Sequence, residues 1–173
     1  KIIQKKYINS ATQKNWAIPQ AKNKWVWIID SDELPELKLI EEIRDFIGSV
    51  DSDVDMAFMP RKNLFWGEFM GKASAYPDYQ SRLFRRDKAL YQDKEVHAQV
   101  EVPGQCHYFK HALVHDDFTD ISSWWTRNNR YYKYELDECN KRDVKWNFKL
   151  QYIKPLYVFF RIYFLKRGFL YGF

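Results

Sequence analysis

Residues 25–33, which read Trp-Val-Trp-Ile-Ile-Asp-Ser-Asp-Glu, decide the fold prediction. Five apolar residues in a row are typical of a strand that is buried on both faces, as in a parallel sheet. Working outward, a periodic apolar pattern after Pro35 predicts a helix, and residues 56–59 predict the next strand. The order strand, helix, strand predicts an α/β protein with a parallel core.

The elements around this stretch are predicted from their periodicity and their turn residues. Residues 11–21 are expected to be helical, and the helix after Pro35 is expected to end at Gly48 and to turn four apolar residues inward: Leu37, Ile40, Ile43 and Ile47. Pro60 is expected to end the second strand, and residues 63–71 to form a loop or a hairpin. Residues 95–102 alternate as a half-buried strand does, Thr119 or Asp120 can cap a helix that runs through Tyr131, and the last 25 residues predict an amphipathic helix that breaks near Pro155.

Composition excludes several classes of protein. The chain has 173 residues, of which 46% are hydrophobic and 18% aromatic, so it is not a disordered segment. Its two cysteines lie 33 positions apart, which excludes a disulfide scaffold and a cysteine-rich zinc module. It contains neither GxGxxG nor GxxxxGK[ST], so the usual glycine-rich phosphate loops are absent.

The net charge of +5 is unevenly distributed along the chain. Residues 1–29 carry six lysines and no acid, whereas residues 30–59 carry ten acids and two bases. Residues 144–173 carry six bases, no acid and eleven aromatic rings. A basic and aromatic tail indicates an anionic partner, and both nucleic acid and lipid headgroups fit it.

Asp30 and Asp32 directly follow the apolar run, at the end of a strand where α/β sheets bind ligands. In an extended segment, side chains two positions apart point the same way, so both carboxylates can meet one hard divalent cation. Mg²⁺ or Mn²⁺ takes one or two carboxylates and fills its other positions with water and phosphate oxygens. The alternative is that these acids only stabilise the N-terminus of the helix after Pro35.

Several motifs, in order along almost the whole chain, carry a family resemblance. The first are Gln13-Lys14-Asn15-Trp16-Ala17-Ile18, residues 25–33, and the stretch Pro77-Asp78-Tyr79-Gln80-Ser81-Arg82-Leu83-Phe84-Arg85-Arg86. Val96-His97, His115, Asn129-Arg130-Tyr131 and Arg167-Gly168-Phe169-Leu170 then follow. Together they resemble the family 2 glycosyltransferases of the GT-A fold, in the bacterial branch that builds lipopolysaccharide core.

The resemblance implies a Rossmann-like mixed sheet with flanking helices, of which this chain is expected to lack the N-terminal nucleotide-binding strands. It implies an inverting enzyme that moves a sugar from a nucleotide-sugar donor to a saccharide acceptor. Asp30, Asp32 and His115 would hold Mg²⁺ or Mn²⁺ on the donor diphosphate, and Lys14, Asn15 and Arg82 would bind the donor. Residues 1–118 are expected to form the catalytic core, and residues 119–173 a helical extension that faces the membrane.

The chain departs from the family pattern at three positions. Lys14 occupies a position where the family has Arg, and Tyr171 occupies the position of an Asp in the last motif of the family. Ala98 replaces the Glu that would be the first choice of general base, so Asp78 and Glu95 become the catalytic candidates, with Glu101 behind them.

The expected place of action is the inner face of the cytoplasmic membrane, where the basic tail would bind anionic lipid and the acceptor would be a lipid-linked saccharide. Nucleic acid is not the expected partner. The alternatives left open are a nucleic-acid-binding or membrane-surface module without catalysis, and a metal-dependent phosphohydrolase that uses Asp30 and Asp32.

Overall fold

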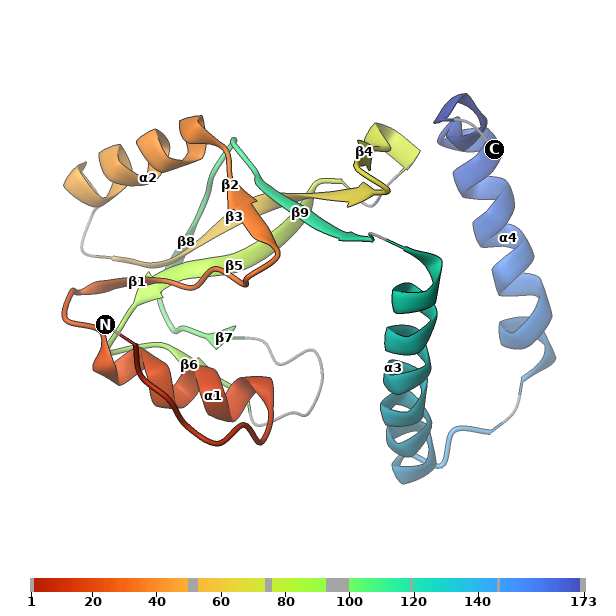
Figure 1. The fold of residues 1–173 in the computed structure, drawn as a ribbon, viewed down its shortest axis with the longest axis horizontal. Coiled ribbons are helices and arrows are strands. Elements are labelled where there is room, and N and C mark those ends of the chain that lie inside the picture. The colour runs from red at the N-terminus through yellow and green to blue at the C-terminus, as the bar shows by residue number, and fades with distance from the viewer. Residues whose placement is uncertain are drawn as a thin grey trace. The chain divides into compact units, whose positions relative to one another are not determined.

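The computed structural model describes residues 2–49, 53–73, 76–92, 100–118, 120–145 and 147–171. The fold is α/β, as predicted from the sequence. Its elements, labelled in Figure 1, begin with α1 (Ser10–Ala17), a 3₁₀ turn (Ile18–Gln20), β1 (Trp25–Trp27), β2 (Glu33–Pro35), α2 (Leu37–Ser49), β3 (Val54–Phe65), β4 (Glu68–Phe69), a 3₁₀ turn (Gly71–Ala73) and β5 (Asp78–Arg85). There follow β6 (Leu90–Tyr91), β7 (Val100–Glu101), β8 (Gln105–Tyr108), β9 (Leu113–Phe118), α3 (Ile121–Lys141), a π-helical turn (Lys149–Ile153), α4 (Lys154–Phe160), a second π-helical turn (Arg161–Leu165) and a 3₁₀ turn (Gly168–Tyr171).

The main sheet is mixed, as the family resemblance implied, whereas the parallel pairing expected of β1 from its apolar run is wrong. Within the described residues its strand order is β1-β5-β3-β9-β2, with β4 and β8 also paired to β3. β1 runs antiparallel to β5, with Trp25 opposite Arg85, whereas β3 and β8 are parallel. β6 and β7 form a separate antiparallel pair.

Helices cover both faces of the strands, which explains why β1 is apolar throughout although it ends the strand order. On one face, Leu39 and Ile43 of α2 pack with Ala57, Met59 and Leu83, and Trp25 and Trp27 lie against this cluster. On the other face, Ala11 of α1 and Ile18 pack with Met56 and Phe84, and Val26 and Ile28 lie against them. Neighbouring strand residues point to opposite faces of the sheet. The continuous apolar run therefore indicates that both faces of β1 are buried, and it does not indicate the direction of the strand.

Helix α2 forms where it was predicted, but its buried face is different. Leu39 is 0% and Ile43 5% exposed, whereas Leu37 is 79% and Ile47 42% exposed. The inner face therefore follows residues 39, 43 and 46, and Phe46 packs edge-on against Trp25. The predicted face shared only Ile43 and Ile40 with the side of the helix that turns away from solvent.

β3 is longer than predicted and continues into a hairpin. Pro60 lies inside the strand and is buried, so the prediction that it ends the strand is wrong. Leu64 pairs with Phe69 and Phe65 with Glu68. Trp66 and Gly67 connect them with φ angles of 50° and 78°, the positive values that a tight two-residue hairpin turn requires. The hairpin interpretation of residues 63–71 is thereby confirmed.

The chain divides into two units, and each is described by itself. The first comprises residues 1–61 and 79–113, and the second residues 62–78 and 114–173. The division of the chain at residue 118 stays a prediction. Most of the strand predicted at residues 95–102 lies outside the described residues. Of this segment the structure describes only residues 100–102, and Val100 and Glu101 form β7.

The second unit contains the two long helical segments. Asp120 caps α3, because its Oδ1 accepts a hydrogen bond of 2.8 Å from the Ser123 backbone N–H. The second helical run passes through Pro155 without a break, with a π-helical turn before α4 and another after it. The predicted break is therefore wrong: Pro155 lies inside the helical run, directly after the π-helical turn Lys149–Ile153 and Lys154. Across the described part of the chain, no helix combines the length and the apolar character that crossing a bilayer requires.

Candidate functional site

The acidic stretch after β1 forms a closed turn. The Glu33 backbone N–H donates to the Asp30 carbonyl oxygen at 3.1 Å, and the Asp30 backbone N–H donates to Glu33 Oε2 at 3.1 Å. Glu33 then enters β2, and α2 begins only at Leu37. Asp30 and Glu33 thus belong to this turn and do not form the first turn of the helix.

Arg82 of β5 joins the two carboxylates. Its Nη2 donates to Asp30 Oδ2 at 2.6 Å and to Glu33 Oε1, and Arg61 Nη1 lies 3.7 Å from the same Glu33 oxygen. The Glu33 side chain is fully buried and that of Arg82 is 8% exposed, whereas the Asp30 side chain is 41% exposed. Buried charges require such partners. Burial alone would lower the pKa of Arg82, but Glu33 and Asp30 outweigh it and hold that pKa above its ordinary value.

Helix α1 brings two more of the predicted residues to this place. Lys14 Nζ lies 3.5 Å from Asp30 Oδ1 and 5.3 Å from the centre of the Tyr91 ring. Asn15 fixes the helix, because its side chain donates to the Tyr91 carbonyl at 2.9 Å and accepts from the Tyr91 N–H at 2.8 Å. The structure therefore brings Lys14, Asp30 and Arg82 together, and it gives Asn15 an anchoring contact.

The pKa values of this cluster reflect its partial burial. Burial lowers the pKa of Lys14, although Asp30 acts in the opposite direction. Burial would raise the pKa of Asp30, but the cations of Arg82 and Lys14 outweigh it and keep that pKa below its ordinary value. Asp30 is therefore an anion between two cations, with part of its surface open to solvent.

Three residues at this place were not predicted as site residues: Glu33, Arg61 and Tyr91. Glu33 was seen only as one acid of the run, and Tyr91 had no motif to mark it. Burial raises the pKa of Tyr91 to about 12, so its hydroxyl stays protonated. The Arg82 Nε–H is buried and has no hydrogen-bond partner among the described residues. No local pattern reports these contacts, because Arg82 meets Glu33 across 49 positions of sequence.

Residues 31 and 32 lie in a turn, so the extended segment that was expected to turn the carboxylates of Asp30 and Asp32 the same way is not formed, and the metal site stays a prediction. No cluster of three or more His, Cys, Asp or Glu side chains able to hold a metal occurs within the described ranges. Asp30 and Asp32 are nevertheless carboxylates with open surface, and Mg²⁺ uses one or two carboxylates besides substrate phosphates. We refer to Lys14, Asp30, Glu33, Arg61 and Arg82 as the charge cluster; it holds three cations and two anions.

A second group of predicted residues meets in the other unit. His115 of β9 is 9% exposed, and its Nδ1 lies 2.8 Å from Asn63 Oδ1. Asn63 Nδ2 donates to Asp78 Oδ2 at 3.2 Å. Asn63 was not predicted, yet it links the expected base Asp78 to the expected metal ligand His115. Glu95 and Ala98 lie outside the described residues, as does His97.

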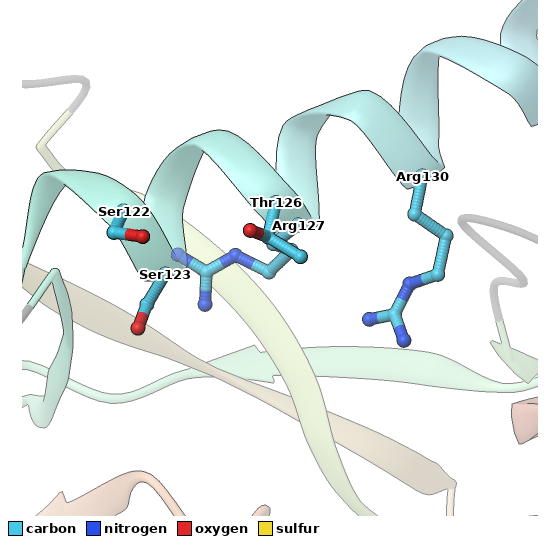
Figure 2. A pocket seen from close by; sticks show the side chains of 5 residues that line it. All are labelled: Ser122, Ser123, Thr126, Arg127 and Arg130. Atoms are coloured by element: carbon cyan, nitrogen blue, oxygen red, sulfur yellow. The ribbon is translucent and has the colours of Figure 1, made fainter.

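Helix α3 carries a hollow of about 400 Å³. Figure 2 shows five side chains that project from one side of the helix: Ser122, Ser123, Thr126, Arg127 and Arg130. Hydroxyl and guanidinium groups are donors that suit an anion.

The chain has a distant relative among known proteins. No known family model matches the chain. The chain is similar to a protein of Rickettsia felis described as an uncharacterized glycosyltransferase, with 25% identity over 185 aligned residues. The alignment covers all of this chain and 65% of that relative, so the chain spans just under two thirds of the relative's length.

Proposed function

We propose that this chain is the catalytic part of a glycosyltransferase of the GT-A type, which moves a sugar from a nucleotide-sugar donor to a saccharide acceptor. The observation that carries the proposal is the meeting of Lys14, Asp30 and Arg82 at the end of β1. The name of the Rickettsia felis relative supports glycosyl transfer. The lipopolysaccharide core is the proposed destination of the sugar, on the strength of the motif order alone.

The charge cluster suits a diphosphate better than it suits a bare cation. A metal ion that arrives alone would meet two cations beside Asp30, whereas a metal–diphosphate complex brings oxygens that Lys14 and Arg82 can bind.

Mg²⁺ or Mn²⁺, held by Asp30 and Asp32, would offset the charge that gathers on the departing diphosphate. The role of His115 as a metal ligand stays a prediction from the family resemblance. The positive side chains of Lys14 and Arg82 would also stabilise the negative charge on the departing diphosphate. Asn15 supports this arrangement by holding α1 against Tyr91.

The proposed transfer inverts the anomeric carbon. The acceptor hydroxyl oxygen forms a bond to that carbon while the bond to the diphosphate breaks, and the diphosphate leaves with the electron pair. The hydroxyl proton passes to a carboxylate within hydrogen-bond reach. Asp78 is the proposed base, since one of its oxygens is already fixed by Asn63, and Glu95 is the other candidate.

The tail supports a membrane-bound acceptor. Of the described residues 147–171 only Gly168 is buried, and Val144 to the end of the chain contains no acid. The rings of this segment contact chiefly one another, as in the stacked pairs Phe159–Tyr163 and Phe160–Phe164. We propose that this surface lies on an anionic membrane at its cytoplasmic face, where a lipid-linked saccharide would be presented.

The proposal is tested by incubating the chain with a panel of nucleotide sugars and Mn²⁺ or Mg²⁺, and by measuring release of the nucleoside diphosphate. Asp30→Asn keeps the shape of the side chain and removes its charge, so we expect at least a hundredfold loss of turnover. Asp45→Asn, on the exposed face of α2, is the matched control and should behave as the wild type. Equal turnover in the wild type and Asp30→Asn would remove Asp30 from the mechanism, and phosphate release without nucleoside diphosphate would favour a phosphohydrolase.

A further inference from the structure

Three side chains from three strands form one hydrogen-bonded line in the second unit. Asp78 begins β5, Asn63 lies in β3, and His115 lies in β9. Asn63 stands between the other two, with its Nδ2 3.2 Å from Asp78 Oδ2 and its Oδ1 2.8 Å from His115 Nδ1. Each end of the one amide group therefore has a defined neighbour.

The chemistry of Asp78 decides which way the amide faces. The group that Asn63 presents to Asp78 is its NH₂, which donates to the carboxyl oxygen Oδ2. The amide oxygen is then turned to His115. The opposite orientation would place an amide oxygen against a carboxylate oxygen, where no proton joins them.

The amide oxygen in turn decides which imidazole nitrogen carries the proton. An oxygen only accepts, so the His115 nitrogen that faces it must donate, and that nitrogen is Nδ1. In the neutral imidazole the other nitrogen, Nε2, then has the lone pair. We infer that Asn63 is a positioning residue, which holds His115 in the tautomer with a proton on Nδ1 and a lone pair on Nε2.

This inference assigns a task to a residue that no sequence motif marked. An imidazole that ligates a metal commonly donates its other ring N–H to a carbonyl or carboxylate, which fixes the ring and the tautomer. Asn63 supplies such an acceptor to His115, and Asp78 fixes Asn63. Only the use of the Nε2 lone pair towards a metal rests on the proposed function; the tautomer itself does not.

The tautomer is measured by long-range ¹H–¹⁵N correlation spectra of the whole chain at neutral pH, with no metal and no donor added. The signals of His115 are assigned by their loss in His115→Gln. We expect the wild type to show a protonated Nδ1 and an unprotonated Nε2. Asn63→Ala removes the acceptor, and Asp78→Ala removes the group that orients the amide, so both variants should shift His115 towards the Nε2–H form.

His107, which stacks on Phe46 in the first unit, is the control for folding and should give unchanged signals in both variants. A wild type with the proton on Nε2, or an Asn63→Ala variant with the wild-type tautomer, would overturn the inference. Because no donor is present, the result is independent of turnover. The tautomer can be confirmed while the transferase proposal fails, and the tautomer can be wrong while the transferase proposal holds.

Discussion

At the scale of single residues, the account depends on Arg82. The motif around Arg82 marked it as a donor-binding residue, and the structure gives it two carboxylate partners, Asp30 and the fully buried Glu33. The sequence reveals Asp30 because it follows an apolar run, whereas the pairing of Arg82 with Glu33 is a tertiary contact that no local pattern reports. Asn63 and Tyr91 were missed for the same reason: their partners are distant in sequence, in β5 and β9 for Asn63 and in α1 for Tyr91.

Loss of Arg82 should destabilise the fold as well as the site. Arg82→Met leaves the Glu33 carboxylate buried without its hydrogen-bonded cation, which costs about 3–5 kcal/mol of unfolding free energy. The double variant Arg82→Met, Glu33→Leu removes both charges and should recover most of that loss. Denaturant unfolding of the wild type, both single variants and the double variant measures the coupling.

The matched control for this cycle is Arg142→Met, which breaks an exposed pair with Glu138 in which the side chains are 72% and 54% exposed. Exposed pairs contribute little, so the change should stay within about 0.5 kcal/mol. If Arg82→Met is as mild as Arg142→Met, the buried pair has no structural role and the geometry of the cluster is wrong.

At the scale of elements, the sequence predicted the positions of β1, α1, α2 and α3 and the β3–β4 hairpin, because periodicity and turn chemistry are local. Strand direction and the inward face of α2 were predicted wrongly. Direction depends on which strand becomes the neighbour, and β1 pairs with β5, which is more than fifty residues away. The face of α2 depends on the rings it meets, Trp25 and Phe109, and apolar residues stand on both sides of this helix.

The inward face of α2 can be tested with two leucines of the same helix. Leu39→Ala opens a cavity among Ala57, Met59 and Leu83, and should lower the unfolding free energy by about 2–5 kcal/mol. Leu37→Ala changes a side chain in solvent, and its effect should stay within about 0.5 kcal/mol. Equal losses, measured by denaturant unfolding, would contradict the observed face, and a larger loss for Leu37→Ala would show that the helix presents the face predicted from its periodicity.

At the scale of the whole molecule, the basic and aromatic tail was predicted from composition, and the structure leaves it exposed. The exposed rings include Phe148, Tyr157, Phe160 and Phe164. Composition is additive along the chain and needs no tertiary information, which is why this feature was accessible from the sequence. The order of strands in the sheet depends on tertiary contacts, and it was therefore not predicted from the sequence.

Vesicle flotation tests the membrane proposal. The chain should float with vesicles that contain phosphatidylserine or phosphatidylglycerol, less well with pure phosphatidylcholine, and less well as salt rises. Arg161→Glu in the tail reverses one charge and should weaken binding by about 2 kcal/mol, since each basic residue near the surface contributes about 1 kcal/mol.

Arg44→Glu makes the same change of charge on an exposed position of α2 and is the matched control, with binding as in the wild type. Equal flotation with neutral and anionic vesicles would contradict the proposal. Preferential binding of a single-stranded oligonucleotide with a steep salt dependence would favour the nucleic-acid alternative instead.

The central claim is that Asp30, with Lys14 and Arg82, receives the diphosphate of a sugar donor together with a divalent cation. It is tested most directly by diffraction at the manganese absorption edge from crystals of the chain grown with Mn²⁺ and a nucleoside diphosphate. The account predicts an anomalous peak within bonding distance of an Asp30 or Asp32 oxygen, with phosphate oxygens in contact with Lys14 and Arg82. A nucleotide bound elsewhere, with Asp30 still paired to Arg82 and no anomalous peak beside it, would contradict it.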